Sequence, residues 1–498
     1  MITLLAFRSL LYRPWRSLLL FLGYGMGVAV MIVLLSIGEA LLTQARDEKL
    51  VGGGNITVLP EGLDIEVMKT GGIGGLFFSI DHSRFVYRQI LASPRFAPLV
   101  RAVAPQIDGK LLYVRTRRGR SIPVRAVGEI PDATRSLGAA PELVSGRWTN
   151  DLGDTQYVAP TDFELRNELD HFHLPPANAE NRETWAEWHY FNVVSPDKHS
   201  WVFISYIVAG DPRGVSWGGR FTITVHDASG GVRRYAALVP APLVRFSTTD
   251  ANLRLGDATV TVLQDGRYEL QGTAAREAGR GPPLSLHLFV QPAPRAYFPG
   301  ASLGGSDLVS GYVVPGLRAD ASGSICEGSQ CTQYDHTQSY HDHNWGIWHG
   351  VTWDWGASRA GPYTILYGRV IPPDSVASAP PLFVYLVDSL GFRAVFRPRE
   401  IKYTDGAIIQ VNGKRVRVPS VAEFADARGD DTLRVRLDIE NAIGTDTRAP
   451  LVERGKQTTS ARDTRPYFIQ MKGSATISGR VGGDVIRGAG TGFFETYR

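Results

Sequence analysis

Residues 340–356 ("YHDHNWGIWHGVTWDWG") combine side chains that can transfer protons, bind metal ions or stabilise cations. The stretch holds three histidines, four tryptophans and two aspartates. This combination fits a metal site, a catalytic acid in an aromatic pocket, or an aromatic plug that holds a β-structure together. The choice depends on the chemistry of each residue and on the elements that position it.

Asp342 is the candidate proton donor. A carboxyl surrounded by indoles loses its hydration, which raises its pKa and keeps it neutral. A neutral carboxylic acid could protonate an alkene, and aromatic faces stabilise the resulting cation by up to about 2 kcal/mol each. In this interpretation Tyr340, Trp345 and Trp348 line the pocket, and His341 or His343 holds water or returns the proton.

The metal interpretation uses His341 and His343, which would share one face of a strand. His336 or His349 would be the third nitrogen ligand of a catalytic zinc. No carboxylate spacing supports this set, so we predict no metal and no cofactor.

The structural interpretation treats the stretch as an aromatic plug between two β-domains. Trp353 and Trp355 would point to the same side of a strand. Asp342 and Asn344 would then hold loop backbone in place.

The composition is that of a globular protein with several domains. The chain has 498 residues, of which 43% are hydrophobic and 20% charged, and its net charge is +4. This charge gives no argument for a nucleic-acid role, and we predict none. Short apolar runs bounded by Gly, Pro, Asp or Asn, without amphipathic helices between them, favour antiparallel barrels or sandwiches.

A faint internal repeat divides this β-rich part. "EWHYFNVVSPDKHSWVFISYIVAGDP" begins one half and "WGIWHGVTWDWGASRAGPYTILYGRVIPPD" begins the other. Each half has tryptophans, a loop, an apolar strand with a tyrosine and a proline-aspartate turn. We predict two barrels, over residues 184–345 and 346–498, that follow a linker at 151–183.

The segment that begins at Leu18 and ends at Gly38 contains no charged residue. About 20 helical residues span the hydrocarbon core of a bilayer. Arg8, Arg13 and Arg16 precede the segment, so the positive-inside rule places the N-terminus in the cytoplasm. We expect residues 1–50 to form a single-pass anchor in a bacterial inner membrane and the bulk of the chain to lie in the periplasm. Cys326 and Cys331 ("CEGSQC") would then form a disulfide.

The N-terminal 150 residues resemble the start of a MacB- or FtsX-type ABC transporter permease. The resemblance rests on "FRSLLYRPWRSLLLFLGYGMGVAVMIVLLSIGEALL", "PVRAVGEIPD" and "VSGRWTND". It implies an α+β periplasmic segment over residues 51–150 and possible contact with ABC ATPase or permease subunits. The three further helices of such permeases do not follow, which argues against transport by this chain alone.

A second resemblance begins near residue 180 and runs to the end. "EWHYFN" (187–192), "YHDHNWG" (340–346) and "GAGTGFFE" (488–495) are similar to the AttH and carotenoid 1,2-hydratase (hydroxyneurosporene synthase) family. The resemblance implies paired lipocalin-like (calycin) barrels with a hydrophobic cavity. The hydratases of that family add water to a terminal double bond of an acyclic carotenoid without a redox cofactor, and some fungal relatives guide the cyclisation of polyenes.

The hydratase pattern places a tyrosine and an aspartate at Tyr340 and Asp342, whereas the following histidine and asparagine look more like the AttH branch. We therefore expect an anchored protein that binds an isoprenoid or other polyene, with hydration or cyclisation by acid catalysis as its chemistry. The alternative is a non-catalytic lipid-binding or accessory subunit of an ABC-type export system. The predicted catalytic residues are Asp342, Tyr340 and His343, and the predicted ligand-binding residues are His341, Asn344, Trp345, Trp348, Trp353, Trp355, Glu187, Trp188 and Tyr190.

Overall fold

The computed structural model describes residues 14–47, 87, 90–91, 94–115, 121–129, 133, 136–137, 170–175, 177, 179–294, 296–304, 309–371, 382–428, 430–448 and 465–498. The chain divides into two compact units, residues 1–75 with 102–150 and residues 76–101 with 151–498. The permease-like motif "VSGRWTND" lies outside the described residues.

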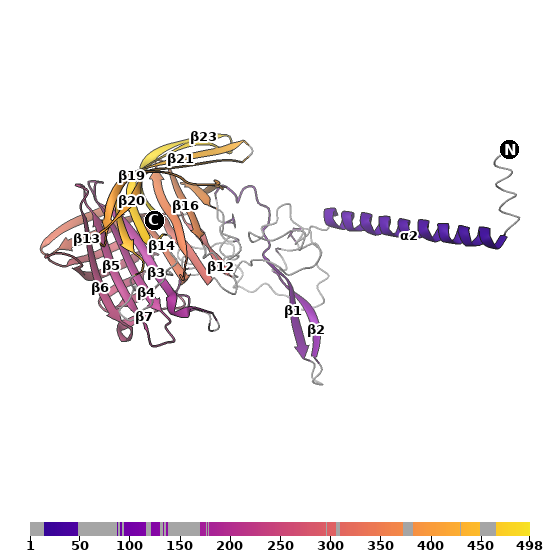
Figure 1. Cartoon of the computed structure of the whole chain (residues 1–498), viewed down its shortest axis with the longest axis horizontal. Coiled ribbons are helices and arrows are strands. Elements are labelled where there is room, and N and C mark those ends of the chain that lie inside the picture. The colour runs from indigo at the N-terminus through magenta and orange to yellow at the C-terminus, as the bar shows by residue number, and fades with distance from the viewer. Residues whose placement is uncertain are drawn as a thin grey trace. The chain divides into compact units, whose positions relative to one another are not determined.

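The first unit contains a long helix and a hairpin (Figure 1). Helix α2 (Pro14–Asp47) includes the whole uncharged segment from Leu18 to Gly38. Its window Pro14–Val33 has a mean hydropathy of 1.8 and is not buried, and no other helix of the described residues is long and apolar enough to cross a membrane. The hairpin pairs β1 (Gln106–Arg115) with β2 (Ser121–Glu129).

The second unit begins its β-structure with a closed barrel. Strand β10 pairs with both β6 and β11, which closes an antiparallel ring in the order β3-β4-β5-β6-β10-β11-β13-β14. These eight strands are β3 (Trp185–Val194), β4 (Trp201–Gly210), β5 (Trp217–His226), β6 (Val232–Pro240), β10 (Tyr268–Arg276), β11 (Leu284–Pro292), β13 (Val309–Glu327) and β14 (Gln330–Ile347). The additional elements are η2 (Arg182–Thr184), η3 (Ala241–Leu243), β7 (Val244–Phe246), β8 (Leu253–Leu255), β9 (Ala258–Val262) and β12 (Phe298–Gly304).

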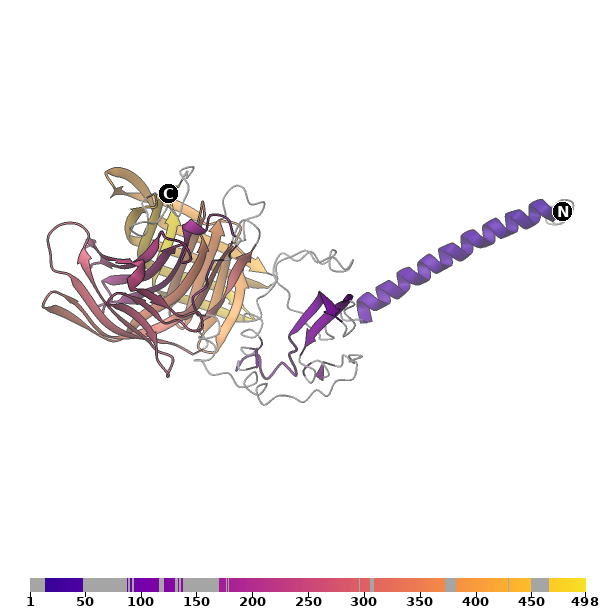
Figure 2. The same cartoon turned by 90° about the horizontal axis from the view of Figure 1, so that it is seen from below.

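A nine-stranded antiparallel sheet packs beside this barrel (Figure 2), in the order β18-β17-β16-β15-β23-β22-β21-β20-β19. Its strands are β15 (Thr352–Ala360), β16 (Tyr363–Ile371), β17 (Phe383–Asp388), β18 (Gly391–Phe396), β19 (Lys402–Val411), β20 (Lys414–Arg428), β21 (Asp431–Asp446), β22 (Tyr467–Val481) and β23 (Asp484–Tyr497). Phe396 and Val411 come from the two end strands yet lie in one core cluster, so the sheet rolls over itself. Those end strands do not pair within the described residues.

The predicted mostly-β, lipocalin-like class is confirmed: an eight-stranded up-and-down barrel followed by a second curved sheet matches it. The alternating short apolar runs form these strands because each one buries one face in a core.

Strand β14 lies between the two cores, and its alternation decides where each side chain of the central motif points. Tyr340 belongs to the aromatic cluster between the barrel and the second sheet. His341, the next residue, stacks on Phe191 in the core of the barrel. Successive residues of a strand face opposite sides, so one motif supplies two separate sites.

Cys326 and Cys331 form a disulfide across the turn between β13 and β14. Replacing both cysteines with serine should lower the free energy of unfolding by about 2 kcal/mol, because the bridge closes a short loop of the unfolded chain. Chemical denaturation measures the difference. A reductant should shift the wild type equally and leave the double variant unchanged, whereas identical stability of the two proteins would contradict the expectation.

Candidate functional site

Asp342 lies on the side of β14 that faces the second sheet, and 3% of its surface is exposed. The Tyr340 hydroxyl donates to its Oδ2 over 2.7 Å, and the Asn344 side-chain amide donates to its Oδ1 over 2.6 Å. The Trp355 indole N–H of β15 donates to the Tyr340 oxygen over 3.1 Å. A side chain at Gly368 would collide with the Trp355 ring, since a Cβ there would lie 2.4 Å from it. The glycine therefore leaves room for the indole that fixes Tyr340.

Burial determines the protonation of this carboxyl. Loss of hydration raises the pKa of Asp342 to about 7, although hydrogen bonds from Tyr340 and Asn344 oppose the rise. Asp342 is thus a buried acid that can hold its proton near neutral pH and release it to a partner.

A second buried acid, Glu495 of β23, faces the same aromatic cluster. Trp353 donates its indole N–H to Glu495 Oε2 over 3.0 Å. Gln470 of β22 lies 3.5 Å from both Glu495 Oε1 and the Tyr190 hydroxyl. Burial raises the pKa of Glu495 to about 8, and the charge of Asp342 adds to the rise. Two carboxyls in one dry region can therefore hold protons at neutral pH.

A small pocket opens between the two sheets beside Tyr340, with a cavity volume of about 10 Å³. It is lined by Asn192, Trp201, Leu317, Gln338, Ser339, Tyr340, Ala357, Ser358, Arg359 and Phe493. Pockets that enclose a drug-sized molecule measure about 300–1,000 Å³. This one holds about one water molecule, so a larger ligand would need the surrounding side chains to move.

The opposite face of β14 carries a different polar cluster inside the barrel. His343 Nδ1 lies 2.7 Å from Asp170 Oδ1, and its Nε2 lies 2.8 Å from Glu187 Oε1. Burial lowers the pKa of His343, but the two carboxylates outweigh it and raise the pKa to about 9. Glu187 also accepts the backbone N–H of His173 over 2.9 and 2.8 Å. The His173 ring in turn stacks on Trp345.

The predicted site residues therefore divide into two groups. Those on the side of the second sheet are Tyr340, Asp342, Asn344, Trp188, Tyr190, Trp348, Trp353 and Trp355. Those facing the barrel are His341, His343, Trp345 and Glu187. The two histidines expected to serve Asp342 thus lie on the opposite face of its strand. His336 and His349 are exposed and join neither group.

Sequence reasoning missed five polar residues of these clusters: Asp170, His173, His189, Gln470 and Glu495. Two of these residues, His189 and Glu495, lie within motifs that the sequence analysis had already singled out. His189 lies two residues after Glu187 in "EWHYFN", and Glu495 closes "GAGTGFFE". His173 lies in the predicted linker at 151–183, but the neighbouring Phe172 is buried in the barrel core.

No protein-family model matches the sequence, and no curated protein matches it. Among solved structures, the chain is similar to an AttH protein from Nitrosomonas europaea, with 14% identity, a TM-score of 0.41 and coverage of 66% of this chain and 97% of that one. It is also similar to kievitone hydratase from Nectria haematococca (12%, TM-score 0.38) and to CghA with Sch210972 (14%, TM-score 0.39), each over 66% of this chain and 94% of the other. At this level of similarity no activity passes from these proteins to the chain.

Proposed function

We propose that the chain is a membrane-anchored protein that binds an isoprenoid or other polyene between its two sheets and hydrates or cyclises it by proton transfer from Asp342. The observation that carries the proposal is a buried carboxyl, held by Tyr340 and Asn344, in an aromatic region beside a pocket.

The proposed reaction needs only this chain and water. The Asp342 carboxyl gives its proton to one alkene carbon, and a carbocation forms on the other. Nearby aromatic faces, among them Tyr340 and Trp355, stabilise the cation. Water adds to the cation and returns a proton to the Asp342 carboxylate, so that the net change is addition of one water molecule. If a second double bond of the same substrate attacks the cation instead, a ring forms.

The proposed location is the periplasmic side of a bacterial inner membrane. The exposed apolar window Pro14–Val33 supports an anchor. The disulfide between Cys326 and Cys331 supports an oxidising compartment for the β-structure.

An activity assay tests the proposal. The purified full chain in detergent micelles is incubated with an acyclic carotenoid in ¹⁸O-labelled water, and the products are analysed by mass spectrometry. Hydration gives a product with labelled oxygen, and cyclisation gives an isomer of unchanged mass. If the chain neither converts nor retains the carotenoid, the proposal fails.

The rival function is that of a non-catalytic lipid-binding or accessory subunit of an ABC-type exporter. The same apolar helix favours it, since a membrane helix can contact partner subunits. Retention of the carotenoid without conversion, together with recovery of an ABC ATPase with the tagged chain, would favour this rival.

A further inference from the structure

We infer that the first barrel binds a divalent transition-metal ion through Asp170, His189 and His341. This site is separate from the acid site, because its residues lie on the barrel side of β3 and β14. The inference does not depend on the proposed function.

The distances among the three side chains suit a shared cation. Asp170 Oδ2 lies 3.6 Å from His341 Nε2, and Asp170 Oδ1 lies 3.9 Å from His189 Nδ1. One ligand atom from each residue lies within 4.8 Å of the others. Zinc bonds of about 2.0–2.1 Å place tetrahedral ligand atoms roughly 3.4 Å apart. Each histidine would therefore move toward Asp170 by a few tenths of an ångström, and the two histidine ligand atoms would approach each other by at most about 1.4 Å.

His341 is prepared to act as a ligand. Its Nδ1 lies 3.0 Å from the Tyr190 carbonyl oxygen, to which it can donate. In the neutral ring this leaves the lone pair on Nε2, and that atom is fully buried without a hydrogen-bond partner. Two electron pairs, from Nε2 and from the Asp170 carboxylate, then face each other. A cation between them removes the repulsion, and a backbone partner for the other nitrogen is typical of metal-bound histidine.

His189 gives the second, independent indication. Its ring is fully buried, and neither of its nitrogens completes a hydrogen bond, although the backbone carbonyl of Ala251 approaches it. A buried polar group without a partner costs about 1–3 kcal/mol. A bound metal ion would satisfy the ring nitrogen that points toward Asp170.

The surrounding residues form the supporting shell that a metal site requires. The Tyr268 hydroxyl donates to Asp170 Oδ2, and His343 holds Oδ1 at 2.7 Å. Because its Nδ1 already contacts Asp170 Oδ1 and its Nε2 lies 2.8 Å from Glu187 Oε1, His343 is a positioning residue and not a ligand. Phe191 stacks on the His341 ring at 4.0 Å, and Phe172 meets His189 edge-on at 5.5 Å. The site is therefore oriented by polar groups and enclosed by apolar ones.

The three proposed ligands indicate which metal ions the site can bind. Two imidazole nitrogens and one carboxylate oxygen suit Zn²⁺ or Fe²⁺, and this number of protein ligands leaves a position for water or substrate. A hard cation such as Ca²⁺ would require more oxygen ligands.

Metal analysis of the full chain tests the inference. The protein is purified in detergent without chelator, its metal content is measured by mass spectrometry, and the chelated protein is titrated with Co²⁺ and Zn²⁺. We expect about one ion per chain and visible Co²⁺ absorption. His189→Gln and His341→Gln should each reduce the content to below a tenth of an ion. His287→Gln is the matched control, because His287 is a half-exposed histidine of the same barrel and should leave the content unchanged.

A further variant keeps the test decisive if the ligand variants misfold. Tyr268→Phe removes only the hydroxyl and should weaken Co²⁺ binding by about 10–100-fold. Chelation should lower the melting temperature of the wild type, and added Zn²⁺ should restore it, because the ion binds the folded state. A folded wild type that contains no metal, binds no Co²⁺ and shows no melting shift would overturn the inference.

Discussion

Asp342→Asn should reduce conversion of the carotenoid by about 10²–10⁴-fold, the usual contribution of a positioned general acid. Asparagine has nearly the same shape and can still interact with Tyr340 and Asn344, but it has no proton to give. Binding of the carotenoid should therefore change little. Single-turnover rates and equilibrium binding, measured separately, distinguish the two effects.

The pH dependence gives a second readout of the same group. Because burial raises the pKa of Asp342 to about 7, the proton-donating form disappears as pH rises through that value. The rate should thus fall on the alkaline side of pH 7. Tyr340→Phe removes a hydrogen bond that lowers the pKa, so the neutral acid should persist to higher pH and the alkaline limb should move upward.

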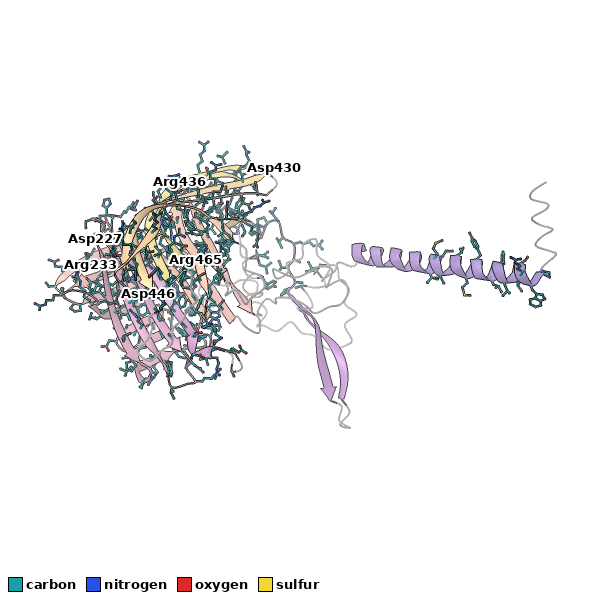
Figure 3. The ribbon with its side chains drawn as sticks, viewed as in Figure 1. Asp227, Arg233, Asp430, Arg436, Asp446 and Arg465 are labelled. Carbon is teal, nitrogen blue, oxygen red and sulfur yellow. A yellow bond between two sulfur atoms is a disulfide. The ribbon has the colours of Figure 1, made fainter. Side chains whose placement is uncertain are left out.

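Asp227→Asn is the control for a generic loss of an aspartate. Asp227 forms an ion pair with Arg233 over 2.9 Å at the turn between β5 and β6 (Figure 3). Its replacement should leave the rate and the pH profile as they are. Full activity of Asp342→Asn would exclude Asp342 as the acid.

The fold class and the central motif could be predicted from local patterns. The alternating strands each carry their own signal, because burial on one face imposes a period of two. A carboxyl among four tryptophans likewise predicts desolvation, and Asp342 is buried as expected.

The composition of each cluster could not be predicted in the same way, because it depends on which strands become neighbours. Trp353 meets Glu495 across 142 positions of sequence, and His343 meets Asp170 across 173. No local period specifies such pairs. The alternation of side chains along a strand could have separated Asp342 from His341 and His343, because successive residues point to opposite faces.

Glu495→Gln should remove a large part of the pH dependence of stability. The folded protein holds the pKa of Glu495 at about 8, against an ordinary value of 4.5 for a glutamate. The folded state therefore binds the proton more tightly than the unfolded state, and this contribution is complete below about pH 4.5 and lost as pH rises to about 8. At about 1.4 kcal/mol per pKa unit, the free energy of unfolding should fall by roughly 5 kcal/mol across that window.

Glutamine keeps the size and the acceptor oxygen of Glu495 but cannot ionise. The free energy of unfolding of the variant should therefore fall less between pH 5 and pH 9 than that of the wild type. Unfolding in denaturant, followed by tryptophan fluorescence, measures this because Trp353 donates directly to the carboxyl. Glu423→Gln is the exposed control and should leave the pH profile unchanged, since solvent already hydrates Glu423. If the free energies of unfolding of the wild type and of Glu495→Gln fall in parallel between pH 5 and pH 9, ionisation of Glu495 does not destabilise the folded protein. The region between the two sheets would then be hydrated, and the dry environment on which proton donation by Asp342 depends would not exist.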